Sequence, residues 1–374
     1  MNDKIRNITV TVVFVLFMAF FVTFCANGFV NPVEKSESER RPLAQLPTDI
    51  TWESILNTSD PEKSTIKLLE KFTVDQFPFR EWFRSLKANL AMNVFHLNEN
   101  NGLVIEDGYI AKVEADFNPG LVEYSVGRLQ YIYDKYLATN GGDKFVCVVP
   151  DKNYLLARDY GYPSPDYAWM VQTVKDALPG MTYIDIFDKL ELSDYYRTDT
   201  HWSQDQIGEV VDEIAANLGI SDRLSGEFTE NSLENFKGVY YLQSALYPTP
   251  DTLVYLTNDI LDACTVYDYE TGKTGSIYDL SQFESEDGYN LFLSGTRALL
   301  RIDNPNATTD EELIIFRDSF GSSITPLLAE GYKSIYVVDI RYVMPDMLSR
   351  MIDFENKDVL FLYSALVLNQ KAFR

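Results

Sequence analysis

From Leu103 to the end of the chain, short apolar runs alternate with longer stretches in which apolar residues recur every three or four positions. Apolar runs bounded by turn residues are typical of buried strands, whereas the wider spacing is typical of helices that pack on a sheet. The alternation favours one α/β domain at residues 103–374, a parallel sheet flanked by helices. We predict strands at 144–149, 183–186, 313–316, 334–339 and 359–363, and helices at 121–137, 167–178 and 207–218, with a further helix ending at Gly331.

Two parts of this domain depart from the alternation. Residues 226–282 show little periodicity and are rich in Tyr, Asn, Thr and Asp, so we expect an inserted lobe or long loops over the site. Near the start of the domain, Asp107 and Gly108 separate two apolar runs. An Asp-Gly pair in that setting predicts a β-hairpin with a two-residue turn.

The N-terminal region has a different pattern. Ile8 to Val30 is a run of 23 residues without a charge, preceded by Lys4 and Arg6. Such a run is long enough to cross a bilayer, and its basic flank predicts a cytoplasmic N-terminus with the bulk of the chain exported. We therefore expect residues 1–30 to be a cytoplasmic tip and transmembrane anchor of a single-pass cell-membrane protein. A cleaved signal peptide, or a lipid-modified Cys25, is the alternative.

Between this segment and the α/β domain, the pattern predicts two further regions. Residues 31–60 carry prolines, serines and mixed charge with little apolar periodicity, which is typical of a juxtamembrane linker. Residues 61–102 have helical spacing interrupted at Phe77-Pro78, so we expect a helical extension made of two helices with a break.

Charge and cysteine content exclude several classes of function. The chain has 56 acidic and 32 basic residues, a net charge of −24, which repels phosphate backbones and argues against a nucleic-acid partner. The same charge makes a neutral glycan an easier partner than an anionic one. Three cysteines are too few for a disulfide scaffold. No HExxH, CxxC pair, P-loop or GxGxxG motif occurs, so we expect no metal and no cofactor.

The chain has only two histidines, His96 and His201, and imidazole is the side chain that titrates near neutral pH. Asp199 stands two positions before His201, where its carboxylate can orient the ring and favour the imidazolium. Ser203 and Gln206 match a capping box, which predicts that His201 lies just before a helix N-terminus. The alternative is that Asp199 is a local turn acceptor and His201 a packed neighbour of the following tryptophan.

His96 stands between Phe95 and Leu97 at the end of the helical extension. We expect it to be a packing or surface residue.

Ser319 follows the predicted strand 313–316 and precedes the helix that ends at Gly331. A serine at such a strand-to-helix turn projects its hydroxyl above the sheet edge, and adjacent backbone N–H groups can receive an oxyanion. Ser319 is therefore the candidate nucleophile. The alternative is that Asp318 or Ser319 only caps the helix.

Residues 198–202, Thr-Asp-Thr-His-Trp, match the Thr-Asp-x-His-Trp signature of the bacterial alginate O-acetylation proteins and of the DHHW protein family, both relatives of the SGNH (GDSL-like) hydrolases. The resemblance to the DHHW family covers nearly the whole chain. Its other landmarks are Glu39–Ala44, Asp75–Arg80, Asn101–Val104, Val149–Lys152, Asp318–Phe320 and Asp339–Tyr342.

This resemblance implies an SGNH-hydrolase-like sheet in which Asp199, His201 and Ser319 form a catalytic triad. Their order along the chain reverses that of ordinary SGNH hydrolases and resembles the circularly permuted order of the alginate proteins. A triad is defined by geometry and role, so the order is no obstacle.

Three positions depart from the family pattern. Thr200 replaces the first histidine of the family's pair, and Arg317 stands where SGNH enzymes usually have glycine. Ser294-Gly295-Thr296 stands where SGNH enzymes carry a Gly-Gly-Asn-like segment whose asparagine is an oxyanion donor, so the resemblance implies that Gly295 and Thr296 lie near the substrate. Thr296 is shorter than asparagine, and losing one such donor costs roughly 100- to 1000-fold in turnover.

Two cationic residues follow predicted strands. The resemblance implies that Arg341 contacts the substrate. It is equally open that Arg341 only forms an ion pair with Asp339 or with Asp346. Lys152 stands at another strand end, where α/β sheets place ligands, although a solvated loop lysine is the ordinary interpretation.

These features predict an extracytoplasmic, membrane-anchored serine O-acetyltransferase or acetylesterase acting on a cell-surface polysaccharide. The expected partners are the glycan, an acetyl donor, the bilayer through residues 8–30 and a membrane acyltransferase. The alternative is a non-catalytic glycan-binding or assembly subunit that retains the fold.

Overall fold

The computed structural model describes residues 3–48, 51–55 and 64–374. They form two compact units, one made of residues 1–97 and 242–247 and the other of residues 98–241 and 248–374. The second unit contains Asp199, His201 and Ser319.

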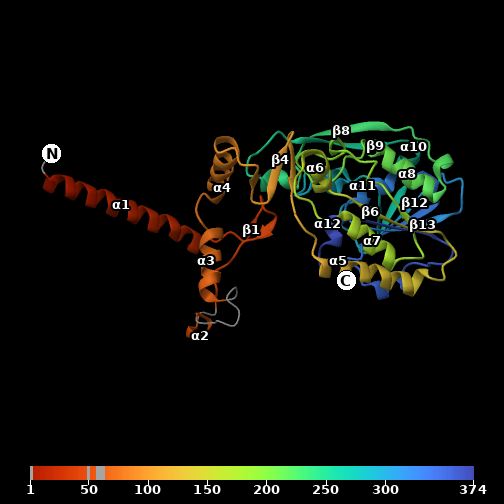
Figure 1. Ribbon diagram of the computed structural model, residues 1–374, viewed down its shortest axis with the longest axis horizontal. Coiled ribbons are helices and arrows are strands. Elements are labelled where there is room, and N and C mark those ends of the chain that lie inside the picture. The colour runs from red at the N-terminus through yellow and green to blue at the C-terminus, as the bar shows by residue number, and fades with distance from the viewer. Residues whose placement is uncertain (1–2, 49–50, 56–63) are drawn as a thin grey trace. The chain divides into compact units, whose positions relative to one another are not determined.

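An eight-stranded sheet forms the centre of the second unit (Figure 1). Its strand order is β11-β10-β12-β14-β13-β15-β6-β7. The five strands from β14 to β7 run parallel, and β12, β10 and β11 extend the sheet with antiparallel pairs. The bounds are β6 (Lys144–Val149), β7 (Thr182–Ile184), β10 (Thr265–Asp268), β11 (Lys273–Gly275), β12 (Leu299–Asp303), β13 (Glu312–Arg317), β14 (Ser334–Val338) and β15 (Asp358–Ser364).

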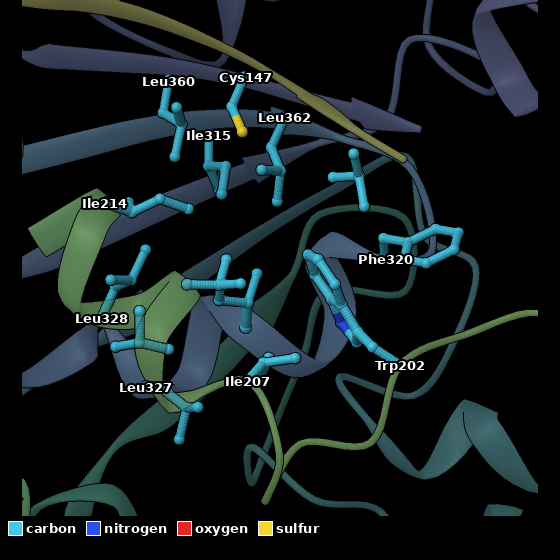
Figure 2. Packing of buried hydrophobic residues seen from close by; sticks show 14 of the residues in the cluster. Cys147, Trp202, Ile207, Ile214, Ile315, Phe320, Leu327, Leu328, Leu360 and Leu362 are labelled. Carbon is cyan, nitrogen blue, oxygen red and sulfur yellow. The ribbon is translucent and has the colours of Figure 1, made fainter. Parts of the chain in front are cut away.

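Helices cover both faces of this sheet, which explains why its inner strands are continuous apolar runs. Successive residues of β13 point to opposite faces. Ile314 packs in the cluster that contains the buried side of α5 and α7, whereas Ile315 packs with α8 and α11. Figure 2 shows Ile315 facing Ile214 of α8 within the second of these clusters. The bounds are α5 (Pro119–Ile132), α6 (Lys152–Tyr160), α7 (Tyr167–Ala177), α8 (Gly208–Leu218), α11 (Gly321–Leu327) and α12 (Ala365–Leu368).

The five strands predicted from the sequence are all present, and the α/β class with a mostly parallel sheet is confirmed. The sheet is nevertheless mixed, because β10, β11 and β12 pair antiparallel, and these three strands were not predicted. Strands β10 and β11 are short and carry polar or exposed residues, so no buried apolar run marks these two.

The predicted lobe at residues 226–282 is correct only in its first part. There, β8 (Thr229–Phe236) and β9 (Asp251–Thr257) form a separate two-stranded antiparallel sheet. Residues 265–275 instead belong to the edge of the main sheet. Two short helices accompany the hairpin, α9 (Val239–Gln243) and α10 (Asp259–Ala263).

A small three-stranded sheet stands at the start of the second unit. It consists of β3 (Glu99–Asn100), β4 (Leu103–Glu106) and β5 (Tyr109–Lys112). Asp107 and Gly108 form the turn between β4 and β5 with φ of 47° and 83°. These left-handed values are those of a tight hairpin turn, so the predicted hairpin is confirmed.

The first unit consists mainly of helices. Its elements are α1 (Asp3–Val30), β1 (Lys35–Ser36), β2 (Arg41–Pro42), α2 (Trp52–Ile55), α3 (Thr65–Asp75), α4 (Arg80–Asn89) and the π-helix η2 (Leu90–Val94). The break between α3 and α4 lies at Phe77-Pro78, as expected.

Residues 31–48, part of the predicted linker, contain the short strands β1 and β2 and an ion pair to α3. Arg41 makes a two-pronged ion pair with Asp75 at the end of α3, with distances of 2.9 and 2.6 Å. This hydrogen-bonded arginine lowers the pKa of Asp75. The remainder of the predicted linker includes residues 49–50 and 56–60, which lie outside the described residues.

The transmembrane helix predicted at residues 8–30 is not supported. Among the described residues, no helix is both long enough and apolar enough to cross a bilayer.

Candidate active site

Ser319 lies in the turn between β13 and α11, where the sequence predicts it. Asp318 holds this turn: its Oδ1 accepts a hydrogen bond from the amide of Phe320 at 3.0 Å. Its Oδ2 accepts from the amide and the hydroxyl of Ser364, at 2.8 and 2.6 Å. The capping alternative holds only in part. The carboxylate of Asp318 does accept from an amide at the start of the α11 turn, but Ser319 bonds His201, and Phe320 itself has no side-chain cap. Asp318 also ties the turn to the end of β15.

The imidazole of His201 bridges the other two predicted triad residues. Its Nδ1 lies 2.6 Å from Oδ1 of Asp199, and its Nε2 lies 2.8 Å from Oγ of Ser319. His201 and Ser319 are 118 positions apart in the sequence. With a proton on Nδ1, the ring donates to Asp199 and can accept the hydroxyl proton of Ser319, which is the arrangement of a nucleophile, base and orienting carboxylate.

Asp199 is 1% exposed, and each of its oxygens has partners. Oδ1 also accepts from the amide of His201 at 3.0 Å, and Oδ2 accepts from the amide of Val239 at 2.7 Å. Burial alone would raise the pKa of this carboxyl, but the facing His201 and the hydrogen bonds together lower it below its usual range. Asp199 therefore stays ionised while it orients the imidazole.

The predicted capping box does not form. The hydroxyl of Ser203 donates to Asp205, and α8 begins only at Gly208 without a side-chain cap. A β-bridge between Tyr195 and Trp202 holds the loop instead, and the amide of Tyr196 donates to the carbonyl of His201 at 3.1 Å. The position of His201 thus results from a strand-like loop, not from a helix N-terminus.

Asp251 of β9 also holds this loop in place, through hydrogen bonds to its first residues. Its Oδ2 accepts from the amide and the hydroxyl of Thr198, at 2.7 and 2.6 Å, and its Oδ1 accepts from the amide of Arg197 at 3.1 Å. No sequence motif marks Asp251, because the residues that its carboxylate binds, Arg197 and Thr198, lie more than 50 positions away along the chain. The β8–β9 hairpin therefore anchors the loop that carries Asp199 and His201.

Lys152 is not solvated. The side chain is buried, and its Nζ donates to the carbonyls of Ile110 and Tyr196 at 2.6 and 2.8 Å. Burial lowers the pKa of Lys152 to about 7. The ordinary interpretation of a solvated loop lysine was wrong, because Asp151 caps α6 and turns the next side chain inward.

Of the two ion pairs that the sequence allows for Arg341, with Asp339 or with Asp346, the structure shows the one with Asp339. Its Nε and Nη2 donate to the carboxylate of Asp339, with a shortest distance of 2.7 Å. Asp346 instead pairs with Lys135. The guanidinium of Arg317 approaches the same Asp339 at 3.9 Å and is fully buried. A substrate contact by Arg341 stays a prediction.

The segment around Gly295 lies next to the nucleophile turn. Nη2 of Arg317 donates to the carbonyl of Gly295 at 3.3 Å. Gly295 has φ of +73°, and a Cβ there would lie 2.3 Å from Oδ1 of Asn290, so glycine is required. Thr296 is exposed. The roles of Gly295 and Thr296 toward substrate stay predictions.

His96 is exposed and has φ of 50°, in agreement with a surface residue. The aromatic neighbours of His201 were not foreseen. The ring of Tyr289 is stacked on the imidazole, and Phe320 lies beside it with ring centroids 5.0 Å apart. An isolated tyrosine in a segment without periodicity gives no signal that could have identified it.

The sequence profile of the DHHW protein family matches residues 180–338, which include Asp199, His201 and Ser319. Residues 180–338 are a DHHW-family segment. The resemblance to this family is therefore confirmed. A search of curated protein sequences gave no significant match.

Several solved structures are similar to this chain in fold. A DHHW family protein from Eubacterium siraeum matches with a TM-score of 0.57 and 21% identity, over 73% of this chain and 94% of that one. Bacillus cereus PatB1, solved with a sulfonyl adduct, matches with a TM-score of 0.56 and 18% identity, over 73% and 99%. The O-acetyltransferase domain of Pseudomonas putida AlgJ gives 0.45 and 16%, over 72% and 93%. At these identities, the first two matches show a shared α/β fold.

Proposed function

We propose that this protein is an extracytoplasmic serine O-acetyltransferase or acetylesterase that acts on a cell-surface polysaccharide. The observation that carries the proposal is the continuous chain from Asp199 through His201 to Ser319, with contacts of 2.6 and 2.8 Å. Two hydrogen bonds in line through one imidazole are what a serine nucleophile needs for activation.

The first half of the reaction makes an acetyl-enzyme. The hydroxyl of Ser319 attacks the acetyl carbonyl of the donor while Nε2 of His201 takes its proton. The negative charge on the carbonyl oxygen would be held by backbone amides of the nucleophile turn, beginning with that of Ser319. The intermediate then collapses as His201 returns the proton to the leaving oxygen, which departs as an alcohol. Ser319 now carries the acetyl ester.

The second half releases the acetyl group. A hydroxyl of the polysaccharide, or water, attacks the ester carbonyl while His201 accepts the attacking proton. Collapse of the second intermediate returns that proton to Ser319 and leaves an acetylated glycan or acetate. The triad serves both outcomes equally. Transfer to a polysaccharide rests on the signature shared with the alginate O-acetylation proteins, and the net charge of −24 favours a neutral acceptor.

The test uses the full chain with p-nitrophenyl acetate, with and without a neutral oligosaccharide acceptor. Ser319→Ala should lower turnover by at least about 1000-fold. Ser322→Ala, a buried serine one turn further along, is the matched control and should keep it. Acetylated oligosaccharide, identified by mass spectrometry, would support transfer, and acetate alone would support hydrolysis.

Equal turnover by wild type and Ser319→Ala would reject the proposal. Oligosaccharide binding by a wild-type chain without turnover would favour the non-catalytic alternative. Thr296, which is exposed and stands where an asparagine oxyanion donor is expected, is the feature that favours this alternative.

A further inference from the structure

The rings of Tyr289 and His201 are stacked face to face. Their centroids lie 3.9 Å apart and their planes differ by 6°. Tyr289 is 3% exposed and is packed against Phe292, with ring centroids 5.0 Å apart. Because the tyrosine is held among buried aromatic residues, it presents a rigid surface to one side of the imidazole.

Ser323 connects this tyrosine to the helix that follows the nucleophile. The hydroxyl of Tyr289 donates to Oγ of Ser323 at 2.7 Å, and the indole Nε1 of Trp202 donates to the same oxygen at 2.9 Å. The hydroxyl of Ser323 points to the carbonyl of Phe320, 3.5 Å away. Burial raises the pKa of Tyr289 far above its usual value, so its hydroxyl remains a donor.

Ser323 stands four positions after Ser319, on α11. The helix that positions the nucleophile therefore also holds Tyr289, which stacks on the base, and Trp202, which follows the base in the chain. Figure 2 shows Trp202 and Phe320 side by side at the edge of the core cluster, where their ring centroids are 5.2 Å apart. The hydroxyl of Ser323 is thus one of the contacts, beside the triad bonds, that tie the surroundings of His201 to the helix after Ser319.

We propose that Tyr289 is a positioning residue that keeps the imidazole of His201 in the plane that contains Asp199 and Ser319. This inference rests on the function proposed above. The two triad hydrogen bonds hold the ring at its two nitrogens, so on their own they resist tilting of the ring about the line between those atoms only weakly. A stacked ring blocks tilting out of that plane.

The positioning of His201 by Tyr289 matters most in the second half of the reaction. Once Ser319 carries the acetyl group, its Oγ has no proton to give, so His201 retains only its bond to Asp199. The stacked Tyr289 then keeps Nε2 aimed at the incoming hydroxyl. A misplaced catalytic group can cost about 100-fold in rate. Loss of the tyrosine ring should therefore slow release of the acetyl group more than its formation.

The kinetic test compares Tyr289→Leu, which removes the ring, with Tyr289→Phe, which keeps the ring and removes the hydroxyl. In Tyr289→Leu we expect a burst of p-nitrophenol followed by steady-state turnover about 10- to 100-fold below wild type. The acetyl-enzyme should be visible by intact-protein mass spectrometry. Tyr289→Phe should restore most of the turnover, because stacking needs only the ring.

A spectroscopic test reports the stacking without any need for activity. The chain has two histidines, and the exposed His96 serves as the internal reference. Ring protons of His201 should be shifted upfield by the Tyr289 ring in wild type and Tyr289→Phe, and should return toward the His96 positions in Tyr289→Leu. Thermal unfolding of each variant checks that it is folded.

The results separate the two proposals. Loss of the upfield shift together with acetyl-enzyme accumulation in Tyr289→Leu supports the positioning role. Loss of the shift with unchanged turnover overturns that role and leaves the esterase or transferase function intact. A wild-type chain that never forms an acetyl-enzyme overturns the proposed function and this role with it.

Discussion

Gly238 lies directly against Asp199. A Cβ on the glycine would be 2.4 Å from Cβ of Asp199 and 2.4 Å from the carbonyl oxygen of Thr198. The next residue, Val239, donates its amide to Oδ2 of Asp199. The close approach that only glycine allows is thus what brings a backbone donor to the second oxygen of the triad carboxylate.

Replacing Gly238 by alanine should displace Asp199 and so turn the imidazole away from Ser319. We expect turnover to fall by about 100-fold, because small misplacements of catalytic groups have effects of that size. Stability should fall by about 1–3 kcal/mol from overpacking. Steady-state kinetics and urea unfolding measure the two effects.

Gly275→Ala is the matched control, since a Cβ at Gly275 meets nothing within 4 Å. It should leave both turnover and stability near wild type. Wild-type turnover in Gly238→Ala would show that the contact between Gly238 and Asp199 does not govern the triad.

Lys152 should make stability depend on pH. Its pKa is about 7 in the folded chain and near 10.5 when the chain is unfolded, so the unfolded chain binds more protons between these values. The free energy of unfolding therefore rises with pH in this window, by at most about 1.4 kcal/mol per pH unit from this one group. Lys152→Met should lack that contribution, as measured by urea unfolding at several pH values.

Lys144→Met is the comparison for this prediction. Lys144 also donates to two backbone carbonyls, of Asn140 and Gly142, but it is only half-buried. Its replacement should preserve the wild-type slope. Equal slopes for wild type and Lys152→Met would contradict the assignment of the pH dependence to Lys152.

Much of the central sheet was predictable because its strands are buried on both faces. Leu313 to Phe316 are fully buried, and a continuous apolar run is the direct sequence trace of that environment. Strand β10 was missed because Tyr267 and Asp268 are only half-buried, so its pattern resembles a loop. Strands near the open side of the sheet, such as β10 and the edge strand β11, leave a weaker pattern than the inner ones.

In the candidate site too, some residues could be predicted from the sequence and others could not. Asp199, His201 and Ser319 were found because their side chains do the proposed chemistry and stand in short motifs. The amide of Val239 has no side-chain signature, and Asp251 and Tyr289 act through contacts distant in sequence. Supporting residues of this kind become visible only when the chain is folded.

Arg341 should contribute to stability through Asp339. The carboxylate of Asp339 is fully buried, and Arg341 is its closest cation. Arg341→Met should lower the free energy of unfolding by about 1–3 kcal/mol, because it removes charge-assisted hydrogen bonds from a buried carboxylate that Arg317, 3.9 Å away, compensates only in part. Urea unfolding measures this loss.

Arg301→Met is the control, because its ion pair with Asp303 is more exposed on both sides and should matter little. If Arg341→Met kept wild-type stability while KM for an acetylated glycan rose, the result would contradict the structural role and support the substrate contact that the family resemblance implies.

Mapping a fluorophosphonate adduct on the full-length chain tests most directly whether Ser319 is activated by His201. We expect the adduct on the peptide that contains Ser319, and its loss in His201→Ala while the Ser322→Ala control still reacts. An unmodified Ser319 in the wild-type chain, or equal modification in His201→Ala, would contradict the account.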